Sequence, residues 1–162
     1  MLQKILILGG YGNFGKRICE QLVNLNTEHK INIIIAGRNP ENAATLVDRL
    51  TPLYLNAQLS TAKIDIHSAQ FTEQLLQLKI DLVIHTSGPF QGQKHTVPSA
   101  CITAKCHYID LADDRRFVCD ISQLDKAAKA AGVLLVSGAS TVPGVSSTVV
   151  SHFSEQFSQL DS

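Results

Sequence analysis

The sequence predicts an α/β fold built on a doubly wound, six-stranded parallel sheet with helices on both faces. Two observations lead to this prediction. Short apolar runs alternate with amphipathic helical patterns along the 162 residues, and a glycine-rich turn joins the first run to the first helical pattern. The length suits one domain with a sizeable core. No apolar run approaches the roughly eighteen residues that a membrane span needs.

The first apolar run, Ile5 to Leu8, is expected to be a strand buried on both faces. Three glycines follow it in the pattern G-x-G-x-x-G. A helical stripe comes next, formed by Phe14, Ile18, Leu22 and Leu25. Strand, glycine turn and helix in this order are typical of dinucleotide-binding Rossmann domains.

Each glycine of the motif has an expected role. Gly10 should allow a sharp turn, Gly12 should let a pyrophosphate approach the backbone, and Gly15 should let the helix pack close to the strand. The free N–H groups and positive dipole of the helix start would face the phosphates. The alternative is a purely structural turn. The intervening residues of the predicted cofactor site are Tyr11, Asn13 and Phe14.

The second strand, expected over Ile31 to Ala36, ends without a carboxylate. NAD-binding domains usually carry an acidic residue there, which holds the ribose hydroxyls. Here Arg38 and Asn39 occupy that neighbourhood. A guanidinium can form two charge-assisted bonds to a 2′-phosphate, which a carboxylate would repel. We therefore expect NADP(H) to be preferred over NAD(H); the alternative is that Arg38 is a solvated surface charge.

Two further segments belong to the predicted cofactor site. Asp65, at the end of the expected third strand, is placed either to accept a hydrogen bond from the adenine amino group or to cap the turn before Ser68. Ser87, Gly88 and Pro89 follow the fourth strand, near the expected pyrophosphate and nicotinamide ribose. An ordinary Gly-Pro turn is the alternative reading of that segment.

The remaining elements follow from periodicity and end signals. Strands are expected over 59–66, 81–85, 107–111 and 133–136. Helices are expected after the caps Asn39 and Ser68, over 96–104, from Ser122 with Asp125 as a capping box, and finally to about Phe157. The helix after Ser122 should turn Leu124, Ala127, Ala128 and Ala131 inward and stop at Gly132.

Composition excludes several kinds of partner. The chain has 14 basic and 14 acidic residues and no basic block, so neither nucleic acid nor an anionic membrane is an expected partner. Without a signal peptide, the expected location is the cytoplasm. The four cysteines, Cys19, Cys101, Cys106 and Cys119, match no zinc or C-x-x-C spacing, so no metal site is expected. Cys101 and Cys106 are expected to be buried free thiols, with metal binding together with His95 and His107 as the alternative. Cys19 is expected to be half-buried on the first helix.

Catalytic residues are not identified by any motif. The Tyr-x-x-x-Lys pair of short-chain dehydrogenases is missing, because the residues four positions after the tyrosines are Gly15, Gln58 and Ala112. Candidate proton donors, each with a structural alternative, are His85, His95 and His107. Residues placed near a substrate, or serving as helix caps, are Asp110, Asp113 and Asp114.

Taken together, four segments resemble the N-terminal NAD(P)-binding domain of the saccharopine dehydrogenase family: Gly9–Gly15, Ala36–Arg38, Ser87–Phe90 and His107–Leu111. The resemblance implies a pyridine-nucleotide oxidoreductase, often of an amino-acid adduct or a related substrate, with a larger C-terminal substrate domain. Relatives often carry Gly-Glu after the Asp-Leu pair, whereas this chain continues Ala112-Asp113-Asp114.

The expected organisation is a dinucleotide-binding domain over 1–142 and a C-terminal helix over 143–162 that leads toward a substrate domain absent from this chain. That helix would act as a bridge, or pack on the sheet, through Val145, Val149, Val150 and Phe153. Such a chain would bind cofactor, meet its small-molecule substrate through the second domain, and be inactive alone; self-association stays open. The alternative function is a non-catalytic NADP(H)-binding sensor or interaction module.

Overall fold

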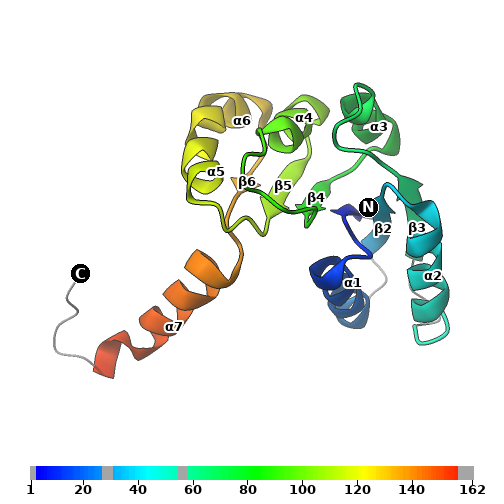
Figure 1. Ribbon diagram of the computed structural model, residues 1–162, viewed down its shortest axis with the longest axis horizontal. Helices are drawn as coiled ribbons and strands as arrows, with labels where there is room; N and C mark the ends of the chain where they lie inside the picture. The colour runs from blue at the N-terminus through cyan, green and yellow to red at the C-terminus, as the bar shows by residue number, and fades with distance from the viewer. Residues whose placement is uncertain (1–2, 27–30, 55–57, 157–162) are drawn as a thin grey trace.

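A computed structural model of the chain describes residues 3–26, 31–54 and 58–156. Six parallel strands form one sheet in the order β3-β2-β1-β4-β5-β6 (Figure 1). This confirms the predicted doubly wound fold. The strands are β1 (Gln3–Leu8), β2 (Ile31–Gly37), β3 (Gln58–Lys63), β4 (Leu82–His85), β5 (His107–Asp110) and β6 (Leu135–Val136). The order reverses between β1 and β4, which makes this pair the topological switch point.

Helices cover both faces of the sheet. Figure 1 shows α1 and α2 on one side and α3, α4 and α6 on the other, while α7 projects away from the body. The helices are α1 (Asn13–Leu25), α2 (Pro40–Leu50), α3 (Phe71–Leu78), α4 (Thr96–Ala104), α5 (Arg115–Asp120), α6 (Asp125–Ala131) and α7 (Ser146–Phe153). Short helical turns cover Ile121–Leu124, Thr141–Val145 and Ser154–Gln156.

Strand β1 is buried on both faces, as its apolar run predicts. Ile5 and Ile7 belong to the core cluster shared with α1 and α2, whereas Leu6 and Leu8 belong to the cluster shared with α3 and α4. Side chains of a strand alternate between the two faces of the sheet, so a continuous apolar run supplies both cores at once.

The buried face of α1 differs from the predicted stripe. Phe14 and Leu25 are 65% and 72% exposed, and the buried positions are Gly15, Cys19 and Val23. Gly15 is the point at which the helix touches the glycine turn, and positions four and eight residues further on lie on that same face. Contact at Gly15 therefore sets the helix orientation. Cys19, expected to be half-buried, is fully buried for this reason.

Residues 58–71 also depart from the prediction. Strand β3 ends at Lys63 instead of Ile66, because Ile64 turns into the core cluster beneath α3. Helix α3 begins at Phe71 after Gln70, which provides no side-chain cap. The Ser68 hydroxyl instead accepts a hydrogen bond from the Gln70 N–H at 3.2 Å, in the turn before the helix.

The predicted capping box at Ser122 is wrong. Helix α5 begins earlier, where the Asp114 carboxylate accepts a 2.8 Å hydrogen bond from the Phe117 N–H. The Ser122 hydroxyl donates to the Cys119 carbonyl oxygen, and α6 begins only at Asp125, after Leu124 and without a side-chain cap. In α6 only Ala128 is buried and Ala127 is exposed, while Gly132 ends the helix as predicted, with φ +70°.

The expected helix after Gly144 is present as α7, but it does not pack on the sheet. Val145, Val149, Val150 and Phe153 are between 43% and 57% exposed. The expected end at Phe157 lies outside the described residues. None of the helices in the described ranges is both long enough and apolar enough to cross a membrane.

Candidate functional site

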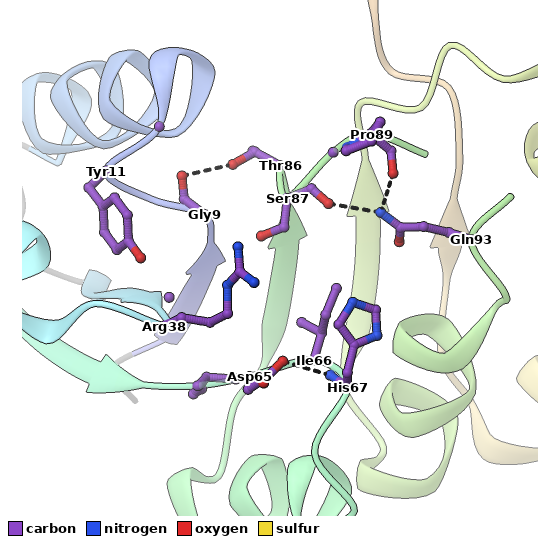
Figure 2. A pocket seen from close by; sticks show the side chains of 14 residues that line it. Gly9, Tyr11, Arg38, Asp65, Ile66, His67, Thr86, Ser87, Pro89 and Gln93 are labelled. Carbon is purple, nitrogen blue, oxygen red and sulfur yellow. Dashed lines mark hydrogen bonds between the residues drawn. The ribbon is translucent and has the colours of Figure 1, made fainter. Parts of the chain in front are cut away.

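A cleft of about 540 Å³ opens at the switch point, at the carboxyl ends of the central strands (Figure 2). Its walls come from four segments: the glycine turn, the end of β2, the residues after β3 and the loop after β4. The volume lies within the range of about 300–1,000 Å³ that is usual for small-molecule sites. Ligands of open α/β sheets bind at this place in the fold.

The sharp turn after β1 contains Gly10, as predicted, and also Gly9, because the Gly12 N–H donates to the Gly9 carbonyl oxygen at 2.8 Å across Gly10 and Tyr11. Gly9 has φ +74°, a conformation that suits glycine, and it lines the cleft. Gly10 has a different constraint, since a Cβ there would lie 2.9 Å from both the Ile35 side chain and the Ile7 carbonyl oxygen. A Cβ on Gly15 would collide with the Gly9 carbonyl oxygen and with Gly10, so this glycine lets the helix pack against the glycine turn, whereas the expectation was close packing against the strand.

Gly12 lines the cleft directly before the start of α1, and this place is suited to an anion. Gly12 is the N-cap, in an extended conformation with φ −71°, and it supplies no side-chain hydrogen bond to the helix. The first turn contains no acidic residue. Backbone N–H groups at a helix start have no partner within the helix, so they and the helix dipole favour a negative group. Asn13 and Phe14 belong to this first turn, but neither of them lines the cleft.

The end of β2 is tied to the glycine turn through Tyr11. Its hydroxyl accepts a 2.9 Å hydrogen bond from the backbone N–H of Asn39, and its ring covers Gly37, where a Cβ would lie 2.6 Å from a ring carbon. Asn39 is the predicted N-cap of α2 and accepts from the N–H of Glu41 at 2.9 Å. Gly37 was not predicted as a site residue. The only feature of the sequence that could have indicated it is a small residue directly before Arg38.

Arg38 is exposed and its guanidinium points into the cleft (Figure 2). Within the described part of the chain, no hydrogen bond or ion pair engages this guanidinium. A second hollow of about 260 Å³ beside the cleft is lined by Arg38, Lys63 and Asp65, so two cations and one carboxylate meet at this end of the sheet and leave a net positive charge. The charge is suited to an anionic group.

Asp65 lines the cleft and also caps a turn, because its Oδ1 accepts a 3.0 Å hydrogen bond from the His67 N–H. The turn-capping alternative is therefore confirmed, and a role toward adenine stays a prediction. Ile66 and His67 form the adjoining wall (Figure 2). Neither was predicted from the sequence, although both directly follow the end of a parallel strand.

The loop after β4 forms the opposite wall. The Thr86 hydroxyl donates to the Leu8 carbonyl at 2.8 Å, which joins the two strands of the switch point. Ser87, Gly88 and Pro89 line the cleft as predicted, and the Gly88–Pro89 peptide bond is cis. Gln93 also lines it and was missed, because a polar loop residue carries no sequence signal.

The three candidate histidines have structural contacts. His85 is fully buried, and burial lowers its pKa to about 4 despite the nearby Asp110 carboxylate, so the ring is neutral at pH 7. His95 Nε2 lies 2.8 Å from the Phe117 carbonyl oxygen, and His107 Nδ1 accepts from the Leu134 N–H at 3.0 Å. The structural alternative is favoured for each.

A buried polar network lies beneath the ends of β5 and β6. Asp110 is fully buried and accepts hydrogen bonds from the Tyr108 hydroxyl at 2.8 Å and from the backbone N–H of Ala112 and Gly138, both at 2.9 Å. The Ser137 hydroxyl is a fourth donor. Asp110 is thus a structural residue, and of the three candidate aspartates only Asp114 caps a helix.

The cysteines are free. Cys101 and Cys106 are buried, as expected, Cys19 is buried more deeply than expected, and Cys119 is exposed. Burial raises the pKa of the Cys19 thiol to about 12. The described ranges contain no group of three or more His, Cys, Asp or Glu side chains that could hold a metal ion.

Residues 5–136 match the family model described as "Saccharopine dehydrogenase NADP binding domain". The chain belongs to this family. The match spans the glycine turn, the Arg38 segment, the loop after β4 and β5, which are the segments that line or support the cleft. Family membership makes the chain an NAD(P)-binding domain of the oxidoreductase type. No curated protein matches the chain significantly.

Solved structures of low sequence identity share the fold of this NAD(P)-binding domain. Saccharopine dehydrogenase (L-Glu forming) from Saccharomyces cerevisiae superposes with TM-score 0.69 at 18% identity, over 94% of this chain and 31% of that one. An NAD binding oxidoreductase from Klebsiella pneumoniae superposes with TM-score 0.60 at 16% identity, over 96% of this chain and 39% of that one. A short-chain dehydrogenase from Sphingobium yanoikuyae in complex with NADPH superposes with TM-score 0.57 at 14% identity, over 83% of this chain and 70% of that one. The chain thus spans about a third of the length of the first two.

Proposed function

We propose that this domain binds NADP(H) in preference to NAD(H) and serves a hydride-transferring oxidoreductase. The observation that carries the proposal is the end of β2, where Arg38 directs into the cleft a guanidinium that no described residue engages, and where the strand end itself has no carboxylate. A guanidinium fits a 2′-phosphate in two charge-assisted bonds. An acidic residue in that place would instead select the unphosphorylated ribose.

The other walls of the cleft would each contact a different part of the cofactor. Gly12 and the first turn of α1 would receive the pyrophosphate, and Asn39 would stand beside the phosphorylated ribose. Ser87, Gly88 and Pro89 would bound the dinucleotide on the β4 side. When bound, the cofactor supplies the hydride chemistry, while the protein supplies position and electrostatics.

We further propose that an amino-acid-type or related substrate reaches the cofactor from a second domain. The proposal is supported by the family match and by the three candidate histidines, since His85 is buried and His95 and His107 have structural contacts. The yeast relative is more than three times as long as the aligned region, since the alignment covers 31% of it. A cytoplasmic location and self-association remain predictions.

The test of cofactor choice is a calorimetric titration of NADPH and NADH against the wild type and Arg38→Ala. Hydrogen bonds to charged groups contribute about 1.5–3 kcal/mol, so the variant should bind NADPH about ten- to hundredfold more weakly and NADH almost unchanged. Arg116→Ala is the matched control, because Arg116 is an exposed arginine of α5 outside the cleft. Equal wild-type affinity for both cofactors, or equal loss of both, would refute the preference.

The test of the second domain is a turnover assay with residues 1–162. NADP⁺ or NADPH would be supplied with amino acids, oxo acids and saccharopine-like adducts, and nicotinamide absorbance followed. We expect binding without saturable turnover, because no substrate is oriented against the nicotinamide and the proximity advantage is lost. Robust turnover would show that the chain carries a complete active site.

A further inference from the structure

The side chain of Gln93 closes the loop that follows β4. Its Nε2 donates hydrogen bonds to the Ser87 carbonyl oxygen at 2.9 Å and to the Pro89 carbonyl oxygen at 2.6 Å (Figure 2). A primary amide has two N–H bonds, so both donors are used within this loop. The backbone N–H of Gln93 adds a third bond, to the Phe90 carbonyl oxygen at 3.0 Å.

The loop begins from a fixed point. The hydroxyl and backbone N–H of Thr86 both donate to the Leu8 carbonyl oxygen, at 2.8 and 2.9 Å, so the start of the loop is anchored to β1. Beyond Thr86 the strand pairing has ended, and Pro89 has no N–H to donate. Gln93 therefore holds the far part of the loop against its anchored start.

The carbonyls that Gln93 holds belong to the residues that form one wall of the cleft. Carbonyl oxygens are negative ends of the peptide dipole and would oppose an anionic ligand if they turned toward it. Bonding to Gln93 turns two of them onto an amide donor. On the opposite side, the Ser87 hydroxyl lies beside Gly9, where a Cβ would approach it to 2.8 Å.

We propose that Gln93 is a positioning residue for dinucleotide binding, which acts by holding Ser87 and Pro89 in the conformation that receives the cofactor. The inference rests on the proposed function of the cleft. A wall that is already ordered binds without a further cost in conformational entropy, whereas a loosened loop must be ordered by the ligand. Loss of the bonds should therefore weaken binding and leave the folded domain intact.

Two substitutions remove the donors in different ways. Gln93→Glu keeps the shape but places a carboxylate against two carbonyl oxygens, and Gln93→Met keeps the length without charge. Each should weaken NADPH binding about tenfold, since two hydrogen bonds are lost. NADH should weaken by the same factor, because the loop lies across the cleft from Arg38 and borders parts common to both cofactors. Gln123→Glu, an exposed glutamine outside the cleft, is the matched control.

Amide hydrogen exchange separates positioning from a general structural role. In free Gln93→Met, residues 86–93 should exchange faster than in the wild type, while the rest of the domain and its unfolding midpoint stay the same. Saturating NADPH should restore slow exchange in that segment. Circular dichroism checks that both variants fold, and if Gln93→Glu does not, Gln93→Met carries the test.

The outcomes are distinguishable from failure of the proposed function. If the wild type binds both cofactors and the Gln93 variants bind them equally well, the positioning role is wrong and the cofactor site stands. If affinity falls for NADPH alone, or falls without a change in exchange of the segment, Gln93 does not act through this loop. If the wild type binds neither cofactor, the proposed function and this inference both fail.

Discussion

The hydroxyl oxygen of Tyr11 accepts a 2.9 Å hydrogen bond from the backbone N–H of Asn39. These residues lie 28 positions apart and join the glycine turn to the end of β2. Together with the ring of Tyr11 over Gly37, the bond holds the residues on both sides of Arg38. The two halves of the predicted cofactor site are thus one connected structure.

Tyr11→Phe should reduce the preference for NADPH. The ring over Gly37 is kept, but the Asn39 N–H loses its partner and the segment carrying Arg38 is held less firmly. A typical hydrogen bond contributes about 0.5–1.5 kcal/mol, so NADPH should bind about three- to tenfold more weakly and NADH less so. Cofactor titration measures both, with Tyr54→Phe, a tyrosine of the α1–α2 core cluster, as control. Unchanged NADPH affinity would mean that Arg38 does not depend on this contact.

Gly12→Val should abolish binding of both cofactors in a protein that still folds. The φ of −71° is open to any residue, and a Cβ at this position makes one tight contact, at 3.1 Å from the Gly9 carbonyl oxygen. A branched side chain would instead occupy the space above the start of α1. Circular dichroism and titration give the two readouts, and Gly12→Ala should have a smaller effect. Retained binding would show that the glycine serves only the turn.

Asp110→Asn should destabilise the fold. The carboxylate accepts four hydrogen bonds, and an amide would place an N–H group against at least one of these donors. Hydrogen bonds to charged groups contribute about 1.5–3 kcal/mol, so a loss of that order is expected in urea unfolding. Asp114→Asn is the control, because asparagine caps helices as well as aspartate does and stability should hardly change. Similar small effects at both positions would argue against the network.

Stability should fall as the pH drops through the range set by His85. Its folded pKa is about 4 and the ordinary value is 6.5, chiefly because burial opposes the charged form. The unfolded state therefore binds the proton more readily. The stabilisation is complete above about pH 6.5 and is lost as the pH falls toward 4, by roughly 3 kcal/mol in all.

The check is urea unfolding of the wild type and His85→Asn between pH 4 and pH 7. Asparagine does not titrate and keeps a donor for the Tyr108 hydroxyl, which lies 3.2 Å from Nδ1 of His85. Between pH 7 and pH 4 the free energy of unfolding should fall by roughly 3 kcal/mol less in the variant than in the wild type. Parallel curves for the two proteins would assign the acid sensitivity to other groups.

Local patterns determined a large part of this protein. The apolar run of β1, the glycine spacing, the Asn39 cap of α2 and the Gly132 stop of α6 all depend on residues close in sequence. Repetition of strand and helix then leaves few topologies, because parallel connections are short and right-handed. Arg38 and Ser87–Pro89 were predicted as site residues because the carboxyl ends of parallel strands meet at one edge of the sheet, and all of them line the cleft.

Only the tertiary structure decided which partners these residues meet. Gly9 adopts the positive φ of the turn, Gly15 sets the buried face of α1, and Tyr11 packs on Gly37, since close packing between segments selects one conformation among several that the local sequence allows. Asp110 was expected near a substrate or at a helix start, but its donors at positions 137 and 138 come from the residues that follow β6. Hydrogen-bond partners of this kind depend on where distant backbone groups lie, and no spacing in the sequence records that.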